Sequence, residues 1–196
     1  MQKDVIKEME KYAEINNIPI MQKSGINFLC KFVEKNNIKN ILEIGSAIGY
    51  SSIRMALVND DIKVTSIEKN QERYLEAIKN IKKCDLEKRI TLILGDALNI
   101  DLDGTYDLIF IDAAKAQYIK FFKKYEKNLN KDGFIISDNM NFHGLVGNAA
   151  KIESKNLRQL VTKIEKYNDF LKENDKYITK FYKTGDGIAV SRIKGE

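Results

Sequence analysis

Residues 41–51 read Ile41-Leu42-Glu43-Ile44-Gly45-Ser46-Ala47-Ile48-Gly49-Tyr50-Ser51, a short apolar strand that runs into a glycine loop and then into a helix. Gly45 allows the chain to turn tightly against a ligand, and Gly49 allows the start of the helix to pack closely. A Gly-x-x-x-Gly loop is common in α/β proteins, so the surrounding sequence decides its meaning. The stretch predicts a cofactor loop at the carboxyl end of a strand.

Outward from this loop, apolar runs of strand length alternate with helical stretches. The runs lie at about 40–44, 63–67, 90–94, 106–111 and 133–137. The helical stretches between them lie at about 50–58, 70–83 and 116–129. Continuous apolar runs that alternate with helices indicate a parallel sheet with helices on both faces. The cofactor loop therefore follows the first strand of a predicted α/β sheet.

Further helices and a hairpin flank this alternating region. Two amphipathic helices occupy about residues 3–37. A longer helix near the end presents one apolar side, formed by Leu157, Leu160, Val161, Ile164 and Leu171. Two last runs, at about 177–182 and 187–193, flank Thr184-Gly185-Asp186-Gly187, which is typical of a hairpin turn. We predict a single domain over residues 1–196, an α/β fold with a doubly wound, mostly parallel seven-stranded sheet that ends in an antiparallel hairpin.

Composition limits the class of protein. With 43% hydrophobic and 31% charged residues, the chain has the make-up of a soluble globular protein. Its first eight residues are too charged for a secretory signal peptide, and runs such as 108–111 are too short to span a membrane. Cys30 and Cys84 lie in no ligand-like spacing, which indicates structural thiols and a cytoplasmic protein. The net charge of +5 suits a nucleic-acid partner, although heavy use of Lys, Ile and Asn explains it as well.

Two acids follow the second and third strands. Glu68 comes directly after Val64–Ile67, where doubly wound folds place an acid that accepts hydrogen bonds from both ribose hydroxyls. Gly95-Asp96-Ala97 ends the third strand, where an adenine ring would lie. Taken singly, Ser51 can be a helix cap and both acids can be solvated. Their common position at the carboxyl ends of successive strands favours a cofactor site.

Hard oxygen ligands end the next two strands. Asp112 closes the strand at 108–111, and Asp138-Asn139 closes the strand at 134–136. Neighbouring strand ends would bring two carboxylates and an amide oxygen together, which suits Mg²⁺. Lys115 reaches the same cleft and can act as the base for a hydroxyl that the cation acidifies. The alternatives are a strand-end cap for Asp112 and a solvated helix start for Lys115.

Several of these residues carry a family resemblance. Glu43-Ile44-Gly45 through Gly49-Tyr50-Ser51-Ser52-Ile53-Arg54-Met55-Ala56, with Asp112-Ala113-Ala114-Lys115 and Asp138-Asn139, resembles the catechol and caffeoyl-CoA O-methyltransferases, a metal-dependent class I family. The resemblance covers about residues 19–193. It implies Lys115 as the catalytic base and Mg²⁺, or a similar divalent cation, held by Asp112, Asp138 and Asn139. It also implies S-adenosylmethionine, bound by Met21, Glu43, Gly45, Ser51, Glu68, Asp96, Ala97 and Asp112.

One departure from the family pattern is Ala47, where many methyltransferases have a glycine. A side chain this small is expected to clear the cofactor. Within the family the chain most resembles the bacterial tRNA 5-hydroxyuridine methyltransferases, through Pro19-Ile20-Met21 and Asp138-Asn139-Met140-Asn141-Phe142-His143-Gly144. This resemblance implies methylation of 5-hydroxyuridine at the anticodon wobble position, which yields 5-methoxyuridine.

Two alternatives to a tRNA acceptor stay open. One is a small catechol-like or caffeoyl-CoA-like molecule with vicinal oxygens, and the other is an RNA-binding protein without catalysis. His143, the one histidine of the chain, is either a surface residue or part of the acceptor pocket. Lys180 agrees with an anionic acceptor. We also expect the protein to form a homodimer and to have no membrane partner.

Overall fold

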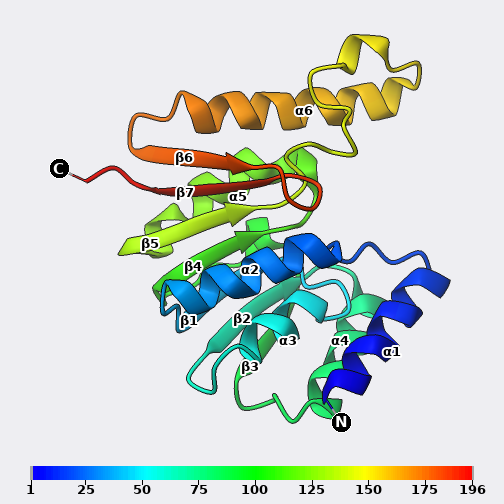
Figure 1. The fold of residues 1–196 in the computed structure, drawn as a ribbon. Helices are drawn as coiled ribbons and strands as arrows, with labels where there is room; N and C mark the ends of the chain where they lie inside the picture. Colours follow the sequence, from blue (N-terminus) through cyan, green and yellow to red (C-terminus); the bar gives the residue numbers. More distant parts are fainter. Residues whose placement is uncertain (1, 196) are drawn as a thin grey trace.

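The computed structural model describes residues 2–195, which form a seven-stranded sheet with helices on both faces (Figure 1). The strands are β1 (Asn40–Ile44), β2 (Lys63–Glu68), β3 (Ile90–Leu94), β4 (Tyr106–Ile111), β5 (Leu129–Ser137), β6 (Tyr177–Tyr182) and β7 (Ile188–Ile193). The helices are α1 (Gln2–Ile15), α2 (Lys23–Lys35), α3 (Tyr50–Ala56), α4 (Gln71–Lys83), α5 (Tyr118–Tyr125) and α6 (Lys155–Lys172). The strand order is β3-β2-β1-β4-β5-β7-β6.

Strand directions confirm the predicted doubly wound fold with its antiparallel end. The five strands from β1 to β5 pair in parallel, whereas β7 pairs antiparallel with both β5 and β6. The turn between β6 and β7 is closed by a hydrogen bond from the N–H of Gly187 to the carbonyl of Thr184, at 3.0 Å. No helix within residues 2–195 is both long and apolar enough to cross a lipid bilayer.

The largest differences from the predicted boundaries, at β5 and α5, have physical reasons. β5 begins at Leu129 rather than at 133, because Leu129 already pairs with Tyr106 before an irregularity in the ladder, and polar residues 130–132 interrupt the apolar run. α5 is shorter than the predicted helix at 116–129, because 3₁₀ turns at 115–117 and 126–128 flank it. The first of these turns carries Lys115.

Alternate residues of the central strands face two separate cores. Ile41 in β1 and Phe110 in β4 pack with apolar residues of α1, α2, α3 and α4. Their neighbours in the same strands, Leu42 and Ile109, pack on the opposite face with aromatic residues of α5 and α6. Since both faces are covered, a ligand can reach the sheet only at its ends. β1 lies between β2 and β4, at the switch point where doubly wound sheets bind ligands beyond their carboxyl ends.

Candidate active site

A cavity of about 920 Å³ opens at the carboxyl ends of β1 to β5. The loop before α2 and the segment after β5 also contribute to its wall. Except for Glu43, every residue that the sequence predicts to bind the cofactor or the metal, or to act as the base, lines this cavity: Met21, Gly45, Ser51, Glu68, Asp96, Ala97, Asp112, Lys115, Asp138 and Asn139. The structure therefore brings residues from all five parallel strand ends around one space.

The chain leaves β1 through a loop that requires glycine at its first position. Gly45 has a φ of 97°, and a Cβ atom there would stand 2.3 Å from the carbonyl oxygen of Asp112. Its N–H donates to the carbonyl of Ile67 in β2 at 2.9 Å. Ala47 also has a positive φ, of 46°, a conformation that glycine adopts more easily. The loop therefore turns tightly against the ends of β2 and β4.

Glu43 lies behind the cavity wall instead of lining it. Its side chain is fully buried, and it accepts hydrogen bonds from the hydroxyls of Ser51, Ser52 and Ser66. Burial raises the pKa of Glu43 to about 7, although the three hydroxyls oppose the rise. Ser51 sits inside α3, whose N-cap is Gly49, so the alternative of Ser51 as a helix cap is wrong. Glu43 can act on a cofactor only through Ser51, which does line the cavity.

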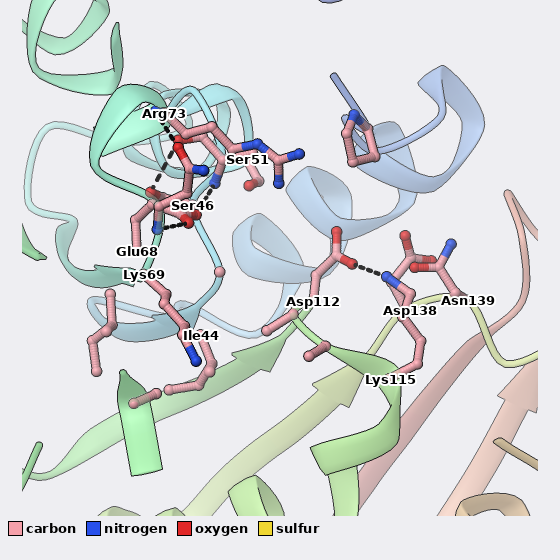
Figure 2. A pocket seen from close by; sticks show the side chains of 18 of the residues that line it. Ile44, Ser46, Ser51, Glu68, Lys69, Arg73, Asp112, Lys115, Asp138 and Asn139 are labelled. Atoms are coloured by element: carbon pink, nitrogen blue, oxygen red, sulfur yellow. Dashed lines mark hydrogen bonds and ion pairs between the residues drawn. The ribbon is translucent and has the colours of Figure 1, made fainter. Parts of the chain in front are cut away.

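Glu68 ties the loop after β1 to the start of α4 (Figure 2). One carboxylate oxygen accepts from the N–H of Ala47 at 2.8 Å, and the other accepts from the N–H of Asn70 at 2.7 Å. The side chain is buried and is therefore not the solvated acid of the alternative interpretation. Each carboxylate oxygen has further accepting capacity, so Glu68 can still accept hydrogen bonds from ligand hydroxyls.

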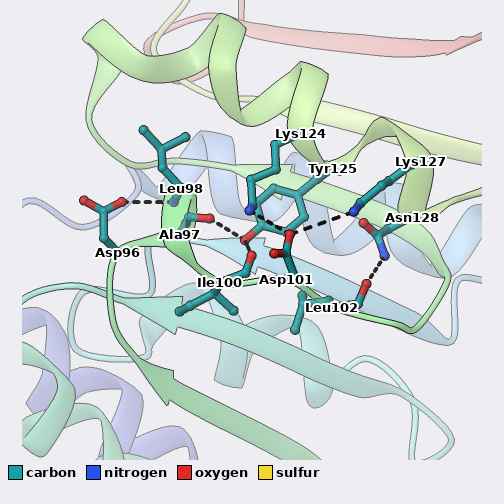
Figure 3. Close-up of polar contacts among 10 residues, drawn as sticks. All are labelled: Asp96, Ala97, Leu98, Ile100, Asp101, Leu102, Lys124, Tyr125, Lys127 and Asn128. Carbon is teal, nitrogen blue, oxygen red and sulfur yellow. Dashed lines mark hydrogen bonds and ion pairs between the residues drawn. The ribbon is translucent and has the colours of Figure 1, made fainter.

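Asp96 begins the loop after β3, which α5 holds in place (Figure 3). Its carboxylate pairs with Nζ of Lys69 at 2.8 Å and accepts from the N–H of Leu98 at 3.0 Å. These two contacts, the Lys69 hydrogen bond first, hold the pKa of Asp96 below its usual range. The hydroxyl of Tyr125 in α5 donates to the carbonyl of Ala97 at 2.7 Å. The segment that carries Asp96 and Ala97 is thus fixed relative to the sheet.

The carboxylates of Asp112 and Asp138 lie beyond the ends of β4 and β5, with the amine of Lys115 drawn between them (Figure 2). Asp138 is only 3% exposed, and its Oδ1 atom is buried without a hydrogen-bond partner among residues 2–195. Burial first, and the nearby charge of Asp112 second, raise the pKa of Asp138. A buried carboxylate oxygen without a partner beside a second acid is unfavourable unless a cation or a proton compensates.

Lys115 places an amine against the same pair of acids. Its Nζ atom lies 3.0 Å from Oδ1 of Asp112, and the two side chains are 21% and 20% exposed. The ammonium also lies over the ring of Tyr118, 5.9 Å from its centroid. Lys115 is therefore a half-buried group directed into the cavity, unlike the solvated helix start of the alternative interpretation. Asp112 faces Lys115, and the residue that caps the following 3₁₀ turn is Ala114.

Asn139 supplies the third oxygen at this end of the cavity. Its Nδ2 atom donates to a carboxylate oxygen of Asp186 at 3.0 Å, which leaves the amide oxygen as the end available to a cation. Within residues 2–195 no group of three or more His, Cys, Asp or Glu side chains is arranged to hold a metal ion. The predicted ligand set is not a group of this kind, because its third ligand is the amide oxygen of Asn139. Two carboxylates, one with an unpaired buried oxygen, and an amide oxygen fit a hard divalent cation.

Several cavity residues were missed by the sequence analysis. Arg73 and Gln117 line the cavity, and the side-chain oxygen of Gln117 is buried without a hydrogen-bond partner in the part of the chain that the structure describes. Neither belongs to a recognisable motif, so the sequence carries no signal for them. Phe142 lines the cavity beside His143, whose side chain is 67% exposed. His143 is therefore exposed and also lines the cavity, and its part in an acceptor pocket stays a prediction. Asp186 was interpreted only as a turn residue.

Comparisons of the sequence relate the chain to known proteins. A sequence model of the O-methyltransferase family matches residues 1–194. The flavonoid 3',5'-methyltransferase of Vitis vinifera is 28% identical over 195 residues, which cover 94% of this chain and 82% of that protein.

Two solved structures share both fold and sequence with the chain. A Staphylococcus aureus protein provisionally described as a caffeoyl-CoA O-methyltransferase is 42% identical, with a TM-score of 0.91 over 97% of this chain and 92% of its own. An O-methyltransferase from Bacillus cereus, solved in complex with S-adenosylhomocysteine, is 25% identical, with a TM-score of 0.81 over 97% of this chain and 91% of its own.

Proposed function

The chain belongs to the O-methyltransferase family, and we propose from this premise that it methylates the 5-hydroxyl of 5-hydroxyuridine in tRNA with the aid of a divalent cation. It is an S-adenosylmethionine-dependent O-methyltransferase. The observation that carries the proposal is the cluster of Asp112, Lys115, Asp138 and Asn139 on the wall of the cavity that the glycine loop also lines. Such a cluster is superfluous in a protein that only binds RNA.

The cofactor half of the cavity suits S-adenosylmethionine. Glu68 would accept hydrogen bonds from the ribose hydroxyls, Asp96 and Ala97 would contact the adenine, and Ser51, oriented by Glu43, would contact the amino-acid end. Bound there, the cofactor supplies an electrophilic methyl group on a sulfonium. Gly45 allows the loop after β1 to pack directly against the backbone of Asp112, where a Cβ atom would clash.

The acceptor half suits a hydroxyl with a second oxygen beside it. Asp112, Asp138 and Asn139 would hold Mg²⁺ or a similar cation, which lowers the pKa of a neighbouring hydroxyl. Lys115 lies 3.0 Å from Asp112 and, in its neutral amine form, would take the proton that this hydroxyl releases. The buried walls of the site hold the reacting groups in place, and proximity alone can contribute about 7–11 kcal/mol.

The tRNA acceptor is supported by charge and by chemistry. In 5-hydroxyuridine the hydroxyl lies beside the C4 carbonyl, so the base offers the two adjacent oxygens that such a site requires. The net charge of +5 favours a polyanionic partner. The second candidate is a small vicinal diol, which the names of the Vitis vinifera and Staphylococcus aureus relatives favour.

Removing the carboxylate of Glu68 is expected to weaken cofactor binding. A hydrogen bond to a charged group contributes about 1.5–3 kcal/mol, so Glu68→Ala should raise the Kd for S-adenosylmethionine by about 10- to 150-fold. Isothermal titration calorimetry measures this Kd. Glu72→Ala, which removes an exposed acid in the first turn of α4, is the matched control. Equal affinity in the wild type and Glu68→Ala would remove Glu68 from the cofactor site.

Salt is expected to separate the two acceptors. Each phosphate that a Lys or Arg side chain neutralises releases counterions, so raising salt from 50 to 200 mM should increase the KM for tRNA roughly tenfold for as few as two contacts. The KM for a neutral catechol should hardly change, and kcat at saturation should stay nearly constant with either acceptor. Steady-state kinetics at several salt concentrations measures these parameters. A salt-independent KM for tRNA would contradict phosphate contacts.

The cellular test of the proposal is mass spectrometry of tRNA nucleosides. Cells that lack the gene should lose 5-methoxyuridine and accumulate 5-hydroxyuridine. The wild-type gene should restore the modification, whereas Lys115→Ala should not. Unchanged 5-methoxyuridine in cells without the gene, with no other enzyme able to supply it, would reject tRNA as the acceptor and favour the small vicinal diol.

A further inference from the structure

A buried carboxylate outside the predicted site contacts the segment that carries Asn139. Asp186 lies in the turn between β6 and β7, 47 residues from Asn139 in sequence, and is 4% exposed. One of its carboxylate oxygens accepts from Nδ2 of Asn139 at 3.0 Å. The other accepts from the backbone N–H of His143 at 2.5 Å. Asp186 thus bridges both ends of the segment 139–143.

The backbone of the same turn holds the middle of this segment. The N–H of Met140 donates to the carbonyl of Gly187 at 3.0 Å, and the N–H of Asn141 donates to the carbonyl of Asp186 at 2.8 Å. Gly187 has a φ of 86°, and a Cβ atom there would stand 2.7 Å from the nitrogen of Asn141. The turn can therefore approach the segment only because residue 187 is glycine.

Segment 139–143 has a backbone conformation that requires such support. Asn139, Phe142 and His143 have φ angles of 63°, 42° and 57°, in the left-handed region that residues other than glycine rarely adopt. Conformations of this kind persist where surrounding contacts hold them. Asn139 and Phe142 both line the cavity, on the side of Asp138.

We propose that Asp186 is a positioning residue that orients the Asn139 amide toward the cation site and fixes the acceptor side of the cavity. A carboxylate can only accept hydrogen bonds, so it selects the NH₂ end of Asn139 and turns the amide oxygen the other way. Its bond to the N–H of His143 holds Phe142 and His143 against the same anchor. This inference rests on the proposed function, because it concerns the cation and acceptor sites of that function.

Asp186→Asn tests the proposal with little change in shape. An amide at this position must direct its NH₂ group toward the NH₂ of Asn139 or the N–H of His143, so a donor faces a donor. Hydrogen-bonded partners of metal ligands typically change metal affinity 10- to 100-fold, and we expect a loss in this range for Mn²⁺ alone, measured by electron paramagnetic resonance. The acceptor KM should also rise. The Kd for S-adenosylmethionine should stay within about twofold, because Asp186 does not line the cavity.

A double-mutant cycle separates positioning from general stability. Asn139→Ala should weaken Mn²⁺ binding, and adding Asp186→Asn in that background should weaken it by no more than about threefold, because the side chain to be oriented is absent. Asp169→Asn, which removes a 61% exposed carboxylate on α6, should leave Mn²⁺ binding and the acceptor KM unchanged.

Two outcomes would overturn the proposal in different ways. Wild-type Mn²⁺ affinity and acceptor KM in Asp186→Asn, with only a lower melting temperature, would make Asp186 a structural residue and leave the proposed function intact. Wild-type protein that binds no Mn²⁺ and methylates its acceptor in excess chelator would reject the cation site itself, and the role of Asp186 with it.

Discussion

Asp138→Ala is expected to reduce methyl transfer to background at ordinary metal concentrations, and a chelator should do the same to the wild-type protein. Asp138 is the most deeply buried of the three oxygen ligands proposed for the cation, and its Oδ1 atom has no hydrogen-bond partner among residues 2–195. Removing it leaves Asp112 as the one carboxylate of the proposed set, beside the neutral amide of Asn139, and this pair should hold Mg²⁺ too weakly at ordinary metal concentrations. Added Mg²⁺ should restore activity to the chelated wild type but not to the variant.

The measurement is the initial rate of methyl transfer against metal concentration. Asp132→Ala, an exposed acid on the same strand β5, is the matched control and should behave as the wild type does. Melting temperatures of both variants show whether a loss of rate follows from unfolding. Full activity of wild-type protein in excess chelator would contradict the cation-assisted reaction with any acceptor.

Lys115→Ala is expected to lower kcat by about 10²- to 10⁴-fold, the usual contribution of a positioned general base. The amine is held 3.0 Å from Asp112 and lines the cavity, so its truncation removes the positioned base from the site. The KM for tRNA and the Kd for the cofactor should change little, because Lys115 contributes to proton transfer and little to the binding of either ligand. Single-turnover kinetics measures the chemical step directly.

Lys115→Arg sharpens this prediction. The guanidinium keeps the positive charge next to Asp112 but does not give up its proton in proteins, so the variant should be as slow as Lys115→Ala. Lys120→Ala, an exposed lysine on α5, is the control. If Lys115→Arg retained wild-type kcat, Lys115 would stabilise charge rather than accept a proton.

The fold was predictable because its strands are continuous apolar runs with polar residues at their carboxyl ends. The limits of β1, β3, β4 and β6 agree with the predicted runs, since each is bounded by a loop or a turn. The true start of β5 was not predictable from apolar pattern, because residues 130–132 are polar and the pairing of Leu129 with Tyr106 is a tertiary feature.

The position of the cavity was predictable because the carboxyl ends of the strands converge at a switch point. The residues that act on the cavity only by contacting another side chain were not predictable. Glu43 follows the two apolar residues Ile41 and Leu42, and its burial behind Ser51 depends on Ser66 from the neighbouring strand. Asp186 lies in the sequence Thr184-Gly185-Asp186-Gly187, where an aspartate is already accounted for by the hairpin turn. Its contact with Asn139 joins positions 47 residues apart, and no spacing in the sequence indicates it.

We infer that this methyltransferase acts on 5-hydroxyuridine in tRNA, and a direct test gives the purified enzyme both candidate acceptors at matched salt. Labelled S-adenosylmethionine, Mg²⁺ and either tRNA that contains 5-hydroxyuridine or a simple catechol are supplied, and the methylated product is quantified for each. If tRNA is the acceptor, we expect efficient methylation of the tRNA, with 5-methoxyuridine as the product nucleoside, and a far lower kcat/KM for catechol. Efficient methylation of catechol with none of the tRNA would contradict it.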